Sequence, residues 1–244
     1  MGARPLFSLS LPAKPAWPTL RRWLLLALAA VVALAAAYPL WLRDSSLVAV
    51  TDVTVIGAER DPGIEADLAH AAMSLSTLDV DESALRAAVA DDPSVVSVSA
   101  SPDFPHGLSV TVDVREPAGY IAADGGVIVA GDGVVLATGI ERPEGLPPIE
   151  VESPEVGARA SGAALALARV LGPAPDALSR RIERGFEDPE LGPVVVLTSG
   201  IELRFGDPAQ AASKWDAAAA VLADPELGSA SYLDLSVPSR PVAG

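Results

Sequence analysis

Three stretches in the first half of the chain alternate between apolar and polar residues as strands do. The clearest runs from Leu108 to Val114, where every second residue is leucine or valine and the residues between them are polar. Similar stretches cover 48–55, with one irregularity before Gly57, and 96–100. A period of two is typical of a strand with one buried and one solvated face. We therefore expect three strands here.

A helical pattern separates the first of these strands from the other two. Asp61-Pro62 has the form of an N-cap followed by proline at the first helical position, and apolar residues recur every fourth position from Ile64 to Ala72. A second helix is expected to begin at Asp81. The resulting order, β-α-α-β-β, predicts a first domain over residues 47–116 with two helices on one face of its sheet.

Residues 117–244 have a mixed pattern that is richer in strands. Apolar residues at 128–130 and 134–136 flank Gly131-Asp132-Gly133, whose residues tolerate the positive φ of a hairpin turn. Asp207-Pro208 is expected to open the last helix, with Gln210 placed as in a capping box. A second, mixed α/β domain with a mainly antiparallel sheet is predicted, its other elements being a helix at 157–171 and strands at 181–186, 193–197, 201–205 and 231–237.

An apolar stretch near the beginning of the chain has a different pattern. The 19 residues from Leu24 to Leu42 carry no charge. As a helix with a rise of ~1.5 Å per residue they would span about 28 Å, close to the thickness of the hydrocarbon layer of a bilayer. Tryptophans favour the edges of that layer, and basic residues favour the cytoplasmic side. The sequence therefore predicts a transmembrane helix over residues 23–42, flanked by Arg21, Arg22, Trp23 and Trp41.

Charge determines the expected orientation of this helix. Four of the 17 basic residues and none of the 32 acidic residues precede it. The positive-inside rule then places residues 1–22 in the cytoplasm, as a disordered tail, and the rest outside. A secretory signal peptide cleaved near Ala37 is the alternative, since Ala35-Ala36-Ala37 resembles a cleavage site. We favour an uncleaved anchor because the apolar stretch is longer than that of a usual signal peptide.

The strongly acidic composition limits the classes of partner. The formal net charge is −15, and the tail carries +4, so the remaining residues carry −19. Such a surface repels nucleic acids and anionic lipid headgroups. The chain has no cysteine, which excludes disulfides and thiolate metal sites. No nucleic acid is expected as a partner.

Candidate catalytic and metal-binding residues are few. His70 and His106 lie in different segments without carboxylates at ligand spacing. The acidic run from Asp79 to Glu82 lacks the later ligands and the glycine of a calcium loop, so a helix N-cap explains it better. No phosphate-binding loop or serine nucleophile motif occurs. We expect no catalytic residue, cofactor, metal or small-molecule substrate, although residues alone leave a carboxylate-only enzyme open.

Several short sequence motifs occur in a fixed order between residues 104 and 235. In this order and spacing, the chain resembles the FtsQ/DivIB family of bacterial cell-division proteins, from about Leu20 to its last residue. The motifs are Phe104-Pro105-His106-Gly107-Leu108, Arg115-Glu116-Pro117-Ala118, the hairpin at 128–135, Leu146-Pro147, the glycines 200 and 206 around Leu203, Lys214 in the last helix, and Leu233-Asp234-Leu235.

The resemblance implies both an architecture and a role. Residues 47–116 would be a POTRA domain and residues 117–244 a C-terminal β domain, anchored by one membrane span with a cytoplasmic N-terminus. Family members have no known catalysis. They act at the division septum, where they link the membrane-embedded septal peptidoglycan synthesis machinery to the FtsB/FtsL (DivIC) pair through the C-terminal domain. A non-enzymatic divisome scaffold at the cell membrane is therefore expected.

The final expected strand is the candidate for partner binding. An outermost strand presents unpaired N–H and C=O groups that can accept a partner strand. Three alternatives remain: a membrane-anchored or secreted cell-envelope enzyme acting on peptidoglycan, a receptor for exported polypeptides, and a secreted α+β protein. The residues expected at the binding edge are Tyr232, Leu233, Leu235, Ser236, Val237 and Ser239, and the competing interpretation is a closing strand that fills the core.

Overall fold

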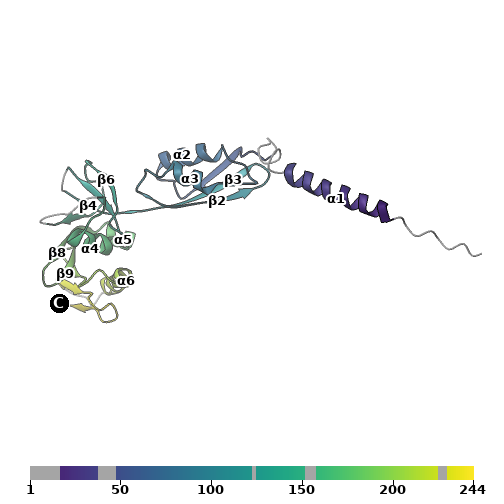
Figure 1. Ribbon diagram of the computed structural model, residues 1–244. Helices are drawn as coiled ribbons and strands as arrows, with labels where there is room; N and C mark the ends of the chain where they lie inside the picture. The colour runs from purple at the N-terminus through teal and green to yellow at the C-terminus, as the bar shows by residue number, and fades with distance from the viewer. Residues whose placement is uncertain (1–16, 38–47, 123–124, 152–157, 225–229) are drawn as a thin grey trace, which may run out of the picture.

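The computed structural model describes residues 17–37, 48–122, 125–151, 158–224 and 230–244 (Figure 1). After helix α1 (Trp17–Ala37), these residues form two sheets, and each sheet has its own cluster of buried apolar side chains. The structure is of the expected α+β class, and its larger sheet is mixed. The chain passes from one sheet to the other between Val114 and Pro117.

The first sheet has three strands, β1 (Asp52–Ile56), β2 (Val95–Asp103) and β3 (Gly107–Val114), in the order β1-β3-β2. Strand β3 is central, parallel to β1 and antiparallel to β2. Its alternate residues are buried, as expected from the sequence pattern. Strand β1 ends at Ile56, and the next residue, Gly57, has a φ of 98°; an added Cβ there would lie 2.1 Å from the Val112 carbonyl oxygen.

Helices α2 (Pro62–Ala72) and α3 (Glu82–Ala88) lie together on one side of this sheet (Figure 1). The Asp61 carboxylate caps α2 by accepting the N–H groups of Gly63 and Ile64, and Pro62 takes the first helical position. Ile64, Leu68 and Ala72 are buried along one face of α2. The local signals therefore predicted this helix and its buried face correctly.

The second sheet has nine strands, with β12 at one edge and β6 at the other. Five of its eight strand pairings are antiparallel and three are parallel. In spatial order the strands are β12 (Val242–Ala243), β11 (Tyr232–Asp234), β10 (Glu202–Arg204), β9 (Gly192–Leu197), β8 (Ile182–Asp188), β7 (Pro148–Glu150), β4 (Pro117–Ile121), β5 (Val127–Ala130) and β6 (Val135–Thr138).

Three helices accompany the second sheet: α4 (Gly162–Leu171), the short α5 (Asp176–Ser179) and α6 (Ala211–Leu222). Residues of α4 and α6 share the buried cluster of this domain with the sheet. Trp215 of α6 is fully buried, its ring centroid lies 5.1 Å from that of Phe205, and its Nε1 donates to the Val170 carbonyl at 2.7 Å. Helix α6 is thus tied both to the sheet and to α4.

The structure contradicts the prediction of a transmembrane helix over residues 23–42. Among the residues that the structure describes, no helix is long and apolar enough to cross a membrane. Helix α1 begins at Trp17, includes Arg21 and Arg22, and ends at Ala37. Its uncharged part, 23–37, therefore spans only about 22 Å, against the roughly 30 Å of a bilayer's hydrocarbon layer. Residues 38–42, with Trp41, and residues 1–16 of the expected tail lie outside the described part.

The junction between the two sheets is held by side chains of the connecting residues. Arg115 Nη1 donates to the carbonyls of Pro93 and Val95, at 2.8 and 3.0 Å, and its Nε donates to Asp132 Oδ2 at 2.9 Å. Asp132 lies in the turn between β5 and β6, so Arg115 joins the end of the first sheet to a hairpin of the second. Glu116 pairs with Arg60 at 2.8 Å, with both side chains exposed.

Candidate partner-binding site

The residues expected at the partner-binding edge separate into core and surface. Leu233 and Leu235 are 1% and 0% exposed and belong to the buried cluster of the second domain. Tyr232 is half-buried, whereas Ser236, Val237 and Ser239 are exposed in the connection that follows β11. The two leucines thus fill the core, as in the competing interpretation of a closing strand. A contact between any of the six residues and a partner stays a prediction.

Strand β11 is not the outermost strand of the sheet. Strand β12 pairs with it in antiparallel register, with Leu233 opposite Ala243 and Asp234 opposite Val242. Beyond β12, Gly244 donates its N–H to the Tyr232 carbonyl at 3.2 Å and accepts the N–H of Tyr232 at 3.1 Å. The outer edge of the sheet is therefore formed by β12 and lies one strand beyond the expected position.

The pairing defines which backbone groups face outward. In an antiparallel pair of strands, opposed residues alternate between pairs that exchange two hydrogen bonds and pairs that exchange none. Tyr232 and Gly244 exchange both bonds. The neighbouring pair, Leu233 and Ala243, is therefore of the second kind, and the N–H and C=O of Ala243 point away from β11. These two groups are available to an added strand.

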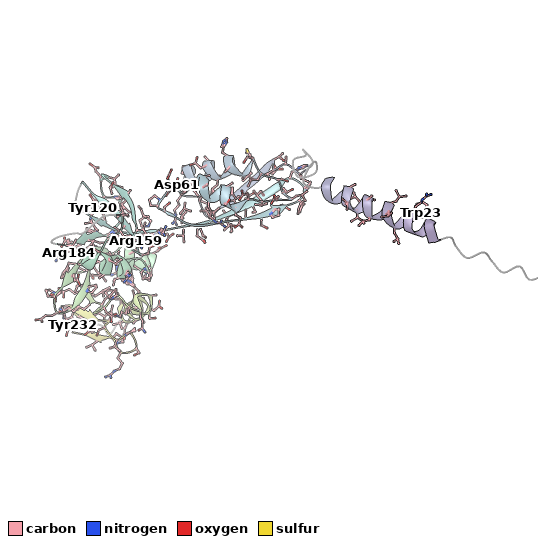
Figure 2. The ribbon with its side chains drawn as sticks, viewed as in Figure 1. Trp23, Asp61, Tyr120, Arg159, Arg184 and Tyr232 are labelled. Atoms are coloured by element: carbon pink, nitrogen blue, oxygen red, sulfur yellow. The ribbon has the colours of Figure 1, made fainter. Side chains whose placement is uncertain are left out.

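Apolar and cationic side chains flank this edge. Val242 and Val237 are 56% and 53% exposed, and both lie in the segment that ends with β12. Two strands in from this edge, on β10, the Arg204 guanidinium lies 4.0 Å from the centre of the Tyr232 ring of β11 and pairs with Glu202 at 2.8 Å. Figure 2 shows Tyr232 within these last strands. The edge thus combines free backbone groups with exposed valines that a partner strand would cover.

The loop between β10 and α6 positions the strands behind this edge. Lys214 of α6 is 2% exposed, and its Nζ donates to the Phe205 carbonyl, the Asp207 carbonyl and Asp207 Oδ1, at 2.8, 2.9 and 3.0 Å. All three ammonium protons therefore have acceptors. The hydrogen bond from Lys214, with that from the Ala209 N–H, lowers the pKa of Asp207. The buried lysine fixes the end of β10 against α6.

The expected capping box of α6 is absent. Gln210 takes the N-cap position in the left-handed region, with a φ of 55°, and makes no capping hydrogen bond with its side chain. Asp207 is engaged by Lys214 and by the N–H of Ala209 instead. The contact of Asp207 with Lys214, seven residues further along the chain, thus replaces the capping pattern that the sequence suggested.

A groove with a volume of about 1230 Å³ lies beside strands β7 and β8 of the second domain. Two of the three acidic residues that line it are engaged: Glu150 pairs with Arg184 at 3.2 Å, and Asp188 Oδ1 accepts the N–H groups of Leu191 and Glu190. These backbone hydrogen bonds lower the pKa of Asp188. Arg184, labelled in Figure 2, also lies 5.4 Å from the centre of the Phe186 ring.

The carboxyl groups with shifted pKa values all shift in one direction. Across the described residues, the pKa values of Glu59, Asp132, Asp188 and Asp207 are lowered. A carboxylic acid that donates a proton in catalysis needs a raised pKa. The described residues also contain no group of three or more histidine or acidic side chains that could hold a metal ion.

The expected anchor flanks are only partly placed. Arg22 and Trp23 lie on α1 with exposed side chains, and Trp23 is 70% exposed. Arg21 lies in the same helix, and its side chain is outside the described part of the chain.

Val242 and Ala243 form the edge strand and were not among the residues expected there. A strand of two residues carries no alternation that could be recognised, and Pro241 before it suggests a turn instead.

Comparison with protein-family models gives no match for this chain, and no curated protein matches it.

Proposed function

We propose that the protein is a non-enzymatic scaffold of the division septum, which links the septal peptidoglycan synthesis machinery to a partner of the FtsB/FtsL (DivIC) type. The partner contributes a strand to the outer edge of β12. The observation that carries this proposal is the outward-facing N–H and C=O of Ala243 at the end of a nine-stranded sheet. Added strands bind sheet edges through such backbone groups, and their side chains supply the specificity.

The surroundings of the edge support a binding role. The exposed side chains of Val237 and Val242 supply apolar area for a partner strand to bury. In the groove at β7 and β8, Glu150 is engaged in an ion pair and Asp188 in a turn. The resemblance to the FtsQ/DivIB family supplies the identity of the partner and the location at the septum.

The proposal is tested most directly by removing the outward donor. Ala243→Pro deletes the N–H that faces a partner strand and leaves every hydrogen bond within the sheet, because that N–H points away from β11. Loss of this bond and of strand continuity should weaken partner binding about 10- to 100-fold, the equivalent of ~1–3 kcal/mol. Ala243→Val keeps the N–H and serves as the matched control.

The measurement uses fluorescent fusions to the N-terminus of the full chain in dividing cells, together with the binding affinity of the purified FtsB/FtsL-type pair. We expect wild type and Ala243→Val to gather at midcell and recruit the pair, and Ala243→Pro to fail in recruitment. An even distribution of the wild type throughout division would contradict the septal role. Equal affinity of all three proteins would contradict the β12 edge as the binding site.

A further inference from the structure

The first sheet has an outer strand of unusual composition. Strand β2 lies at the edge of the order β1-β3-β2, and no charged residue occurs from Pro93 to Pro102, in a chain of net charge −15. The segment from Val95 to Ala100 consists of valine, serine and alanine. Uncharged segments with high strand propensity at a sheet edge are those that pair with other chains. Such an edge needs protection if the protein is to stay monomeric.

Hydrogen bonds define which groups of β2 face outward. Ser94 accepts the N–H of Arg115 at 2.7 Å, so its carbonyl faces the sheet. An irregularity between Val95 and Ser97 then shifts the register by one residue. Beyond it the N–H of Ala100 donates to the Glu82 side chain at 3.3 Å, so Ala100 faces away from β3. By the alternation of an antiparallel strand, Val98 and Pro102 face outward as well.

Two features remove outward donors from this edge. Glu82, in the first turn of α3, covers the N–H of Ala100 with its Oε1, while its Oε2 pairs with Arg86 one turn further along. Pro102 has no N–H to donate. Of the three outward positions, Val98 alone has an N–H without such a cover. Glu82 is therefore the side chain that can open or close the edge.

We propose that the outer edge of β2 is a self-association surface, and that Glu82 keeps it closed. The partner is β2 of a second copy of this chain. Two antiparallel copies would be related by a twofold axis at Ser99, with Val98 of each copy opposite Ala100 of the other. This arrangement makes four backbone hydrogen bonds, and two of them require the Ala100 N–H groups that Glu82 occupies. The surface is independent of the β12 edge and of the proposed role in division.

The composition of β2 makes this pairing self-complementary. Val98 and Ala100 point to the buried side of the sheet, while Ser97, Ser99 and Ser101 lie on its exposed side. A symmetric pair would therefore continue the apolar face and the hydroxyl face across the axis, with no charge opposite a like charge. Like charges directly opposite each other would destabilise such a pair, and β2 has none between Pro93 and Pro102.

The test uses a cysteine at the symmetry axis, because the chain has none of its own. Ser99→Cys places two thiols in a non-hydrogen-bonded pair with Cα atoms about 4.5 Å apart, within reach of a disulfide. Glu82→Asp is the opening variant, since it keeps a carboxylate at the start of α3 but is one methylene too short to reach Ala100. In the double variant we expect the association constant of the dimer to rise about 10- to 100-fold, from two restored hydrogen bonds.

Two controls distinguish the loss of the hydrogen bond between Glu82 and the Ala100 N–H from other effects of Glu82→Asp. Glu82→Gln keeps an oxygen that can accept the Ala100 N–H, so with Ser99→Cys it should cross-link no faster than Ser99→Cys alone. Thr111→Cys with Glu82→Asp should not cross-link, because Thr111 lies on β3 opposite Ser99 and would be about 14 Å from its copy, three strand spacings away. Sedimentation at 0.15 M salt and hydrogen exchange of Val98 and Ala100 complete the measurement.

Four outcomes would overturn the proposal. One is a folded Glu82→Asp variant that dimerises no more than wild type. Another is a Glu82→Gln variant that dimerises as strongly as Glu82→Asp. The third is cross-linking through Thr111→Cys at the rate of Ser99→Cys. The fourth is a dimer that survives Ser99→Asp, which would set two carboxylates against each other at the axis.

Discussion

The edges at β2 and β12 differ in what covers their outward backbone groups. At β2 the side chain of Glu82 occupies the N–H of Ala100, and proline stands at the next outward position. At β12 the N–H and C=O of Ala243 face outward, and no strand lies beyond them in the described part of the sheet. The longer edge is thus covered and the shorter edge is open.

The difference shows that the length of a strand does not decide whether its edge is available. Strand β2 spans nine residues and β12 only two. A long neutral edge could pair with other exposed strands, and two of the three outward positions of β2 offer no free N–H. A short edge makes few backbone bonds, so its specificity depends on flanking side chains such as Val237 and Val242. The two domains can therefore be tested separately, in order of expected effect.

Trp215→Ala should have the largest effect and should act on the second domain alone. The substitution removes a fully buried indole, its contact with Phe205 and its hydrogen bond to Val170. A loss of about 3–5 kcal/mol is expected from a buried tryptophan replaced by alanine. Hydrogen exchange resolved by residue should then show β9 to β11 unprotected and β3 still protected. Equal loss of protection in both sheets would mean that the two domains unfold as one unit.

Lys214→Met should have the next largest effect on the free energy of unfolding. It should destabilise the strands behind the β12 edge without creating a cavity in the core. The side chain volume is kept, but the carbonyls of Phe205 and Asp207 lose a buried cationic donor. Hydrogen bonds from charged groups contribute about 1.5–3 kcal/mol each, and a net loss of about 2–3 kcal/mol in urea unfolding is expected. Asp207→Asn is the control, with a smaller loss because that side chain is 72% exposed. Similar losses in both variants would contradict this assignment.

The pH dependence of the junction between the domains should be the smallest effect. Partial burial acts to raise the pKa of Asp132, but the hydrogen bond from Arg115 and the N–H of Val134 lower the pKa below its ordinary value. A lowered pKa in the folded state stabilises the fold above the unfolded pKa of about 3.9, and this contribution disappears as the pH falls through the folded value. Because the Asp132 side chain is 46% exposed, less than about 1 kcal/mol is expected.

Asp132→Asn isolates this contribution, since the amide does not titrate. Urea unfolding of wild type and variant between pH 6 and pH 2 should give curves that converge toward acid pH. The distance between dyes on the two domains should change over the same window in wild type only. A constant difference between the two proteins at every pH would show that the pair with Arg115 contributes nothing to stability.

Local sequence signals predicted the elements that depend on local physics. Helix α2 follows from the Asp61 cap, Pro62 and three apolar residues on one face, and all three features are present in the structure. The turn between β5 and β6 follows from its glycines, and the buried face of β3 from its alternation. These features require no knowledge of what packs against them.

Elements that depend on distant partners were predicted less well. The strand expected over 231–237 is only Tyr232–Asp234 in the structure, because the chain turns after Leu235 and returns as β12. Helix α1 was expected over residues 23–42, whereas in the described part of the chain it runs from Trp17 to Ala37 and its uncharged part covers residues 23–37. Gln210 makes no capping hydrogen bond with its side chain, and Asp207 instead accepts a hydrogen bond from Lys214 of the same helix.

The sequence by itself determined the α+β class, the order of the first helices and strands, and the neutrality of β2. Only the tertiary structure decided which edges are open. The outward direction of a backbone group depends on the register with the neighbouring strand, and its cover depends on a side chain from another element. Glu82 reaches Ala100 across 18 positions of the sequence, and Ala243 faces outward because Gly244 pairs with Tyr232. Neither contact leaves a periodic signal in the chain, because both depend on distances that exist only after folding.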